Sequence, residues 1–122
     1  MIRTLIVDDD ERFRCLIKGM LLRELGIDVI GEAENGQNAI FKAEELKPEV
    51  VLMDIRMPGM NGLETTSMLK KAMPGLKVII LTILDMDEYK EAAKAVGADG
   101  YILKKSVKED LIREISSIYS RP

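Results

Sequence analysis

Side chains capable of chemistry stand at the ends of four short apolar runs in this 122-residue sequence. They are two adjacent carboxylates, a third carboxylate, a hydroxyl and an amine: Asp8, Asp9, Asp54, Thr82 and Lys104. A short apolar run bounded by turn residues is typical of a strand buried on both faces. The carboxyl ends of parallel strands lie at one edge of a sheet, where α/β proteins bind their ligands. We therefore expect these five side chains to share one pocket.

Three neighbouring carboxylates repel one another, which raises the pKa of at least one of them. A hard divalent cation such as Mg²⁺ or Mn²⁺ relieves this repulsion, and Mg²⁺ also shares oxygens with phosphate groups. A cation beside Asp54 would let this carboxylate attack a phosphoryl group in line and form an acyl phosphate. Lys104 would supply a compact positive charge, and Thr82 a hydroxyl donor, for the transferred group. The predicted chemistry is phosphoryl transfer to a carboxylate.

Composition excludes several other kinds of site. The sequence has no histidine, which removes Ser-His-Asp and Cys-His catalysis, histidine-ligated zinc and an internal phosphohistidine. The single cysteine, Cys15, allows no intrachain disulfide and no CxxC metal site. A net charge of -3 gives no electrostatic footprint for nucleic acid, so we expect no direct nucleic-acid contact. We find no signal-peptide or membrane-spanning pattern and expect a cytoplasmic protein without membrane contact.

Strands and helices must alternate along the chain to position these side chains. Strands are predicted at 5–7, 27–33, 50–54, 78–81 and 100–103. Helices are predicted over 13–25 and 39–46, between Asn61 and Pro74, between Asp85 and Gly97, and from Ser106 through Ile118. This alternation predicts one α/β domain spanning 1–122, a flavodoxin-like (βα)5 doubly wound parallel sheet with strand order 2-1-3-4-5.

Particular residues are expected to set the helix ends. Three N-terminal capping pairs are predicted: Asn61 with Glu64, Asp85 with Glu88, and Ser106 with Glu109. Gly26 is expected to end the first helix in the left-handed conformation, and Gly97 to end the fourth. Asp10 is expected to be a cap or a solvated residue rather than part of the acid pocket.

Four stretches, in this order and at these separations, resemble the receiver domain of bacterial two-component response regulators along nearly the whole chain. They are Leu5–Asp9, Met53–Gly62, Leu81–Thr82 and Gly100–Lys104. The ending Lys104-Lys105-Ser106 looks most like the subfamily with LuxR/NarL-type helix-turn-helix output domains. The resemblance implies a signalling domain rather than an enzyme. Such a domain catalyses only its own aspartyl phosphorylation and dephosphorylation. The output domain that would control transcription is expected to be absent from this chain.

The resemblance also implies a phosphoacceptor and its metal site. By it, Asp54 accepts a phosphoryl group from a partner sensor histidine kinase, in a reaction that needs Mg²⁺ or Mn²⁺. Asp8 and Asp9 would form the metal-binding acid pair together with Asp54. The backbone carbonyl of Arg56 would be a further metal ligand.

Three more residues receive roles from the resemblance. Thr82 and Lys104 would contact the phosphoryl group, and Tyr101 would be the aromatic residue that changes rotamer on activation. The face formed by the fourth helix, the fifth strand and the fifth helix would then change its binding preference. Such a face would support a phosphorylation-dependent homodimer.

Several positions depart from the common family pattern or vary within it. Lys105 replaces a proline that often follows the lysine. A cis peptide bond without proline costs about 2.5–4 kcal/mol, so a cis bond cannot be assumed between Lys104 and Lys105. Ile83 stands next to Thr82 at a position that is usually small, so we expect its bulk to crowd the phosphoryl site or to restrict the loop. Arg56 and Leu84 occupy variable positions that tune phosphoryl lifetime in the family.

Three other functions compete with this interpretation. A phosphatase or phosphotransferase of the haloacid-dehalogenase type normally needs a second Asp two residues after the first, where this chain has Arg56. A flavin- or nucleotide-binding domain needs a Gly/Ser/Thr loop after the first strand, where Asp8–Asp10 would repel phosphate. The third is an interaction module of the same fold that signals without phosphorylation. The acid pair, Thr82 and Lys104 argue against it, whereas Ile83 keeps it open.

Overall fold

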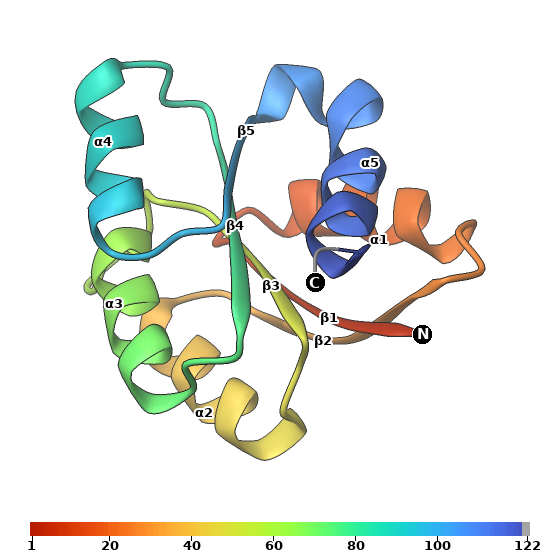
Figure 1. Ribbon diagram of the computed structural model, residues 1–122, viewed down its shortest axis with the longest axis horizontal. Coiled ribbons are helices and arrows are strands. Elements are labelled where there is room, and N and C mark those ends of the chain that lie inside the picture. The colour runs from red at the N-terminus through yellow and green to blue at the C-terminus, as the bar shows by residue number, and fades with distance from the viewer. Residues whose placement is uncertain (121–122) are drawn as a thin grey trace.

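Five parallel strands form one twisted sheet in the order β2-β1-β3-β4-β5 in the computed structural model, which describes residues 1–120 (Figure 1). The strands are β1 (Ile2–Val7), β2 (Ile27–Ala33), β3 (Val50–Met53), β4 (Lys77–Thr82) and β5 (Gly100–Leu103). The predicted flavodoxin-like arrangement and its strand order are confirmed. The order reverses between β1 and β3, which makes this the point where such sheets bind their ligands.

Five helices cover the two faces of the sheet. They are α1 (Glu11–Leu22), α2 (Gly36–Leu46), α3 (Gly62–Ala72), α4 (Asp87–Ala95) and α5 (Val107–Ser120), with a 3-10 turn at Lys104–Ser106 before α5. Helices α1 and α5 lie on one face, and α2, α3 and α4 on the other (Figure 1). Among the described residues, no helix is long and apolar enough to cross a bilayer.

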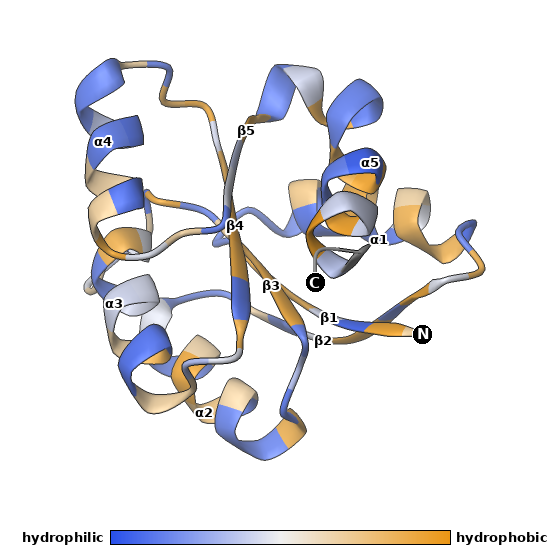
Figure 2. Cartoon of the chain, viewed as in Figure 1, coloured by the Kyte–Doolittle hydropathy of each residue, from blue (hydrophilic) through white to orange (hydrophobic). Residues whose placement is uncertain are grey.

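Successive side chains of a strand point to opposite faces of the sheet. Both faces are buried because helices cover each of them. Leu5, Val51 and Ile80 belong to the core under α2, α3 and α4. The alternate residues, such as Ile6 and Leu52, belong to the core under α1 and α5. Figure 2 shows that the central strands are mostly hydrophobic, whereas the helices around them mix hydrophobic and hydrophilic residues. A sheet packed on both sides fixes the positions of the strand ends.

Strand register determines which polar residues become neighbours. Val7 of β1 pairs with Met53 of β3, so Asp8 and Asp54 follow at the same level of the sheet. The Asp54 amide donates a hydrogen bond to the Val7 carbonyl at 3.0 Å. At the other side of the sheet, Thr82 of β4 pairs with Leu103 of β5. The ends of β1, β3, β4 and β5 therefore bring polar side chains to one edge of the sheet.

The first helix ends earlier than predicted. It stops at Leu22, and the Glu24 amide then bonds the Leu21 carbonyl at 3.0 Å, which turns the chain toward β2. Gly26 has no left-handed conformation, so its predicted role as the helix terminator is wrong. Leu25 is 95% exposed, because the turn closes before the side chain can reach the core.

Two of the three predicted capping pairs are also wrong. Helix α4 begins after Met86 without a side-chain cap, because Asp85 forms an ion pair with Lys90 at 2.9 Å instead. Helix α5 follows directly on the 3-10 turn that ends at Ser106, and no hydrogen bond between Ser106 and Glu109 is found in the described part of the chain.

Other predicted helix ends are confirmed. Asn61 and Glu64 form the complete capping box at the start of α3. Gly97 follows α4 with a φ of 91°, a conformation that glycine adopts without a steric penalty. Asp10 caps α1, because its side chain accepts hydrogen bonds from the backbone amides of Arg12 and Phe13.

Candidate functional site

Three carboxylates meet at the carboxyl edge of the sheet, where β1 and β3 end. One oxygen from each of Asp8, Asp9 and Asp54 lies within 4.8 Å of the other two. Asp8 and Asp54 are only 2% and 6% exposed, whereas Asp9 is open to solvent. Two buried negative charges with an exposed third offer oxygen ligands to a hard cation and a route by which it can enter.

Lys104 reaches this acid cluster from the turn after β5. Its Nζ lies 2.8 Å from Asp8 Oδ2 and 3.4 Å from Asp54 Oδ2. All peptide bonds among the described residues are trans, including the bond from Lys104 to Lys105. One ammonium against three carboxylates leaves the cluster with an excess of negative charge. That excess favours binding of a divalent cation.

Burial and charge set the protonation states of the cluster. Burial and the nearby Asp8 charge raise the pKa of Asp54 to about 6, although Lys104 opposes the shift. Burial lowers the pKa of Lys104, but its contacts with Asp8 and Asp54 outweigh burial, so the net shift is upward. At neutral pH the site therefore pairs an ionised, poorly hydrated Asp54 with a protonated Lys104, a combination suited to nucleophilic attack.

The loop after Asp54 folds back tightly against it. The Ile55 amide donates to Asp54 Oδ1 at 2.8 Å, and the Gly62 amide donates to the Ile55 carbonyl at 2.8 Å. A Cβ at position 62 would lie 1.8 Å from the Asp54 carbonyl oxygen, so only glycine fits there. The sequence shows Gly62 after a cap residue but does not show this close approach. Arg56 lies in this loop with its side chain exposed.

The segment after β4 contributes Thr82 and the two residues that follow it. Thr82 is fully buried, and its hydroxyl accepts a hydrogen bond from the Leu84 amide at 3.3 Å. Among the described residues, no hydrogen bond joins Thr82 to Asp54 or Lys104. Ile83 is 65% exposed. The side chain is therefore largely open to solvent, and its expected effect on the phosphoryl site or on the loop stays a prediction.

Tyr101 lies farther from the acids, on the α4 side of the sheet. Its hydroxyl donates to the Leu84 carbonyl at 2.7 Å. Burial first, and then the charge of Asp85, raises the pKa of this phenol. The half-buried ring is thus tied to the loop that follows Thr82, a connection that the sequence alone does not show.

Two residues of α1 contribute to the site without having been predicted. The Phe13 ring centroid lies 4.2 Å from Lys104 Nζ. Arg14 Nη1 donates to the Asp8 carbonyl at 2.6 Å, and Arg14 Nε lies 3.1 Å from Glu32 Oε1. Helical spacing assigns Phe13 to the apolar stripe of the first helix. Nothing in that spacing indicates that its ring contacts the Lys104 ammonium.

Comparison with known proteins adds to this geometry. The family model described as the response regulator receiver domain matches residues 4–116. The chain belongs to this receiver family. Receiver domains are signalling domains of two-component systems; they generally bind Mg²⁺ at an acidic pocket, and response regulators are phosphorylated by sensor histidine kinases.

Individual relatives place this receiver domain near the LuxR/NarL-type regulators. Response regulator GacA of Pseudomonas protegens is 39% identical over 120 residues, which cover 98% of this chain and 56% of GacA. Response regulator protein VraR of Staphylococcus saprophyticus is 41% identical over 119 residues, covering 98% of this chain and 57% of VraR. The chain thus spans little more than half the length of these relatives.

Solved structures show the same receiver fold. A DNA-binding response regulator of the LuxR family from Staphylococcus aureus has a TM-score of 0.90 and 30% sequence identity, covering 97% of this chain and 98% of its own. The receiver domain of the response regulator NarL from Mycobacterium tuberculosis has a TM-score of 0.92 and 26% identity, covering 98% of both chains.

Proposed function

We propose that this receiver domain, a single domain over 1–122, accepts a phosphoryl group on Asp54 from a sensor histidine kinase in a Mg²⁺-dependent reaction. One observation carries the proposal. Asp54 is a buried carboxylate at the end of the central strand, with acids on one side and the Lys104 ammonium 3.4 Å from its Oδ2. The chain contains no histidine, so the donor histidine lies outside these 122 residues.

The two oxygens of Asp54 have different partners, which indicates how it would react. Oδ1 accepts a hydrogen bond from the Ile55 amide, and Oδ2 faces the Lys104 ammonium. An Asp54 oxygen would form the bond to phosphorus while the bond from phosphorus to the leaving group breaks, and the leaving group would keep the electron pair. Lys104 already lies where negative charge on the transferred oxygens would need stabilisation. The Thr82 hydroxyl would donate to the same group.

The donor atoms of the cluster fit Mg²⁺. Asp8, Asp9 and Asp54 offer carboxylate oxygens, and the backbone carbonyl of Arg56 would complete the protein ligands. When bound, Mg²⁺ would neutralise charge on the phosphoryl oxygens and on the carboxylates. Asp10 stays outside this set because its carboxylate caps α1.

The connection from Thr82 to Tyr101 supports a switch. Movement of Thr82 toward a phosphoryl group would carry Leu84 with it, and the Tyr101 hydroxyl would lose or change its acceptor. The face of α4, β5 and α5 would then shift between two populations. We propose that this face forms a phosphorylation-dependent homodimer and controls transcription through a helix-turn-helix output domain, as the LuxR-type relatives suggest.

Intact-protein mass after incubation with acetyl phosphate tests the proposal. We expect one added phosphoryl group in the wild type with Mg²⁺, none without Mg²⁺, and none in Asp54→Asn. An unchanged mass with acetyl phosphate, and again with a partner kinase, would reject phosphorylation and favour an interaction module that signals unmodified.

Sedimentation of the phosphorylated and unphosphorylated protein tests the homodimer, which an unchanged monomer fraction would contradict.

A further inference from the structure

The ammonium of Lys104 has neighbours on two sides. Two carboxylates lie on one side, with Asp8 Oδ2 at 2.8 Å and Asp54 Oδ2 at 3.4 Å. The aromatic ring of Phe13 lies on another side, with its centroid 4.2 Å from Nζ. A cation within about 6 Å of a ring centroid is attracted by the negative face of the ring. The contact is therefore short enough to hold the amine.

We propose that Phe13 is a positioning residue for Lys104. The ring supports the ammonium so that it lies over Asp54 before a phosphoryl group arrives. The inference rests on the proposed phosphorylation of Asp54. It assigns Phe13, on α1, a part in the reaction although it need not touch the reacting atoms.

The physical reason is the freedom of the lysine side chain. The lysine side chain is a flexible stem of four carbons, and its ammonium is strongly hydrated in water. The Lys104 side chain is only 16% exposed, so the ring and the carboxylates together take the place of much of that water. A group that is already in place loses less conformational freedom when the reaction begins.

The support itself is fixed in position. Asp10 caps α1 at the amides of Arg12 and Phe13, at 3.0 and 3.3 Å. Arg14, the next residue, holds the Asp8 carbonyl at 2.6 Å. The first turn of α1 therefore fixes both the ring beside the ammonium and the backbone of one of its carboxylate partners.

A purely structural role for Phe13 gives a different expectation. The ring packs at the edge of the core under α1 and α5, where Ile17, one turn later, is fully buried. If Phe13 only filled this edge, leucine would replace it without effect on Lys104. The two roles are therefore separated by a variant that keeps the apolar volume and removes the ring.

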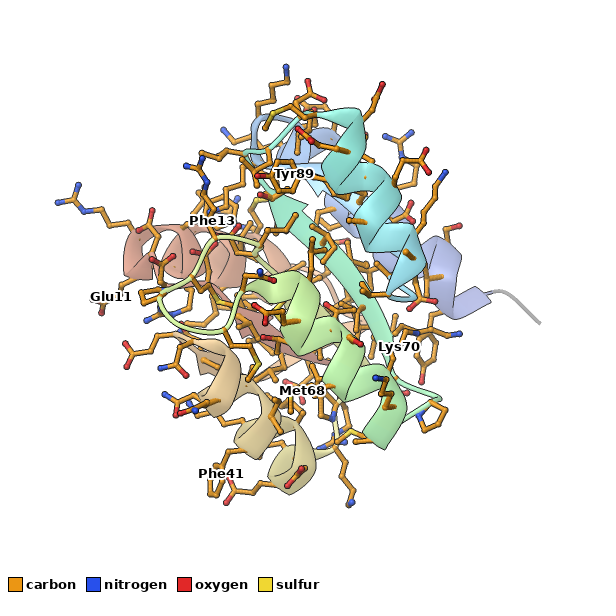
Figure 3. All side chains as sticks on the ribbon, turned by 90° about the vertical axis from the view of Figure 1, so that its left-hand side faces the viewer. Glu11, Phe13, Phe41, Met68, Lys70 and Tyr89 are labelled. Atoms are coloured by element: carbon orange, nitrogen blue, oxygen red, sulfur yellow. The ribbon has the colours of Figure 1, made fainter. Side chains whose placement is uncertain are left out.

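The experiment compares Phe13→Leu, Phe13→Tyr and the control Phe41→Leu. Phe41 is the only other phenylalanine, and it is exposed on α2, away from Phe13 (Figure 3). We expect the rate of phosphorylation by acetyl phosphate to fall roughly 3- to 30-fold in Phe13→Leu. Phe13→Tyr should restore the rate, because it keeps the ring, and Phe41→Leu should match the wild type.

A second measurement reports the contact without any activity. In the metal-free protein, the ring should shift the Lys104 Hε protons in a carbon–proton correlation spectrum. This shift should disappear in Phe13→Leu and remain in Phe13→Tyr and Phe41→Leu. In a Lys104→Ala background, Phe13→Leu should have no further effect on the rate, because the two residues act as one unit.

Three results would overturn the proposal. They are an unchanged rate in Phe13→Leu, equal slowing in Phe13→Leu and Phe13→Tyr, and full slowing by Phe13→Leu in the Lys104→Ala background. Failure of the proposed function gives a different result, in which the wild type itself is not phosphorylated. The Lys104 shift then still decides whether Phe13 holds the amine.

Discussion

The two sides of the site are held by different kinds of contact. On the α1 side, Lys104 lies between two carboxylates and a ring, and Arg14 joins the Asp8 carbonyl to Glu32. Lys104 and Arg14 there each have at least two partners from other parts of the chain. On the β4–α4 side, Ile83 is exposed, and α4 begins without a side-chain cap.

On the second side, the contacts that connect Thr82, Leu84 and Tyr101 are hydrogen bonds between uncharged groups. The Tyr101 hydroxyl reaches the Leu84 carbonyl, and the Leu84 amide reaches the Thr82 hydroxyl. Segments with few such contacts open at lower free energy than a packed core does. Under the proposed phosphorylation of Asp54, we expect the α1 side, called here the acid side, to keep its charged groups in place and the β4–α4 side to move when the charge at Asp54 changes.

Removing Lys104 should break the acid side most severely. Lys104→Ala deletes the ammonium beside Asp54, and loss of one such stabilising group costs about 100-fold in rate. We expect a fall of this size in phosphorylation by acetyl phosphate. Lys105→Ala is the matched control, because the Lys105 side chain is 76% exposed, and its rate should stay near that of the wild type. Equal rates for the two variants would contradict the role of Lys104.

Adding one methyl group to the loop behind Asp54 should have the next largest effect. Gly62→Ala would place a carbon 1.8 Å from the Asp54 carbonyl oxygen, so the backbone must move. We expect a loss of about 3 kcal/mol in the free energy of unfolding, measured with urea. Gly75→Ala has no heavy atom within 4 Å of the new carbon, so its change should stay within about 0.5 kcal/mol. A stable Gly62→Ala protein would show that this loop is not tightly packed.

Neutralising Asp54 should stabilise the metal-free protein at neutral pH. The pKa of Asp54 rises from 3.8 to about 6 on folding, so the folded state binds more protons than the unfolded state in this window. Stability is therefore lost as the pH rises through the window. We expect Asp54→Asn to gain on the order of 1–3 kcal/mol at pH 7 and almost nothing at pH 4.

Asp85→Asn provides the opposite comparison for this pH dependence. The Lys90 ion pair lowers the pKa of Asp85, so neutralising Asp85 removes a favourable charge and should give no gain at pH 7. Thermal unfolding in the presence of a chelator measures both variants. An Asp54→Asn gain that does not change between pH 4 and pH 7 would contradict the assigned pKa.

The smallest effect is expected on the β4–α4 side. Tyr101→Phe removes the hydrogen bond to the Leu84 carbonyl, which contributes about 0.5–1.5 kcal/mol to stability. Phosphorylation of Asp54 should proceed at the wild-type rate, because Tyr101 does not contact the acid cluster. A large fall in that rate would show that the two sides are not separate.

Much of this arrangement follows from local sequence patterns. Apolar runs that end in Asp8, Asp54, Thr82 and Lys104 predict strand ends, and the rule that parallel strands share a carboxyl edge brings these residues together. The fold and the strand order follow from the same alternation of strands and helices. The Asn61 capping box was predictable because all its partners lie within one helical turn.

Other features depend on contacts that the sequence does not show. The Phe13 ring meets Lys104, and Tyr101 meets Leu84, only after the sheet has assembled. Local patterns also fail where a tertiary partner competes, as when Asp85 binds Lys90 rather than capping α4. Gly26 failed as a terminator because the turn at Glu24 closes the helix first.

Hydrogen exchange before and after phosphorylation tests the central contrast most directly. Amide exchange would be followed by mass spectrometry, with Mg²⁺ present throughout and acetyl phosphate added to one sample. We predict altered exchange within residues 83–101 and unchanged exchange within residues 11–22, once intact mass shows full phosphorylation. Altered exchange at 11–22, or no change at 83–101, would contradict the account of a fixed acid side and a mobile switch side.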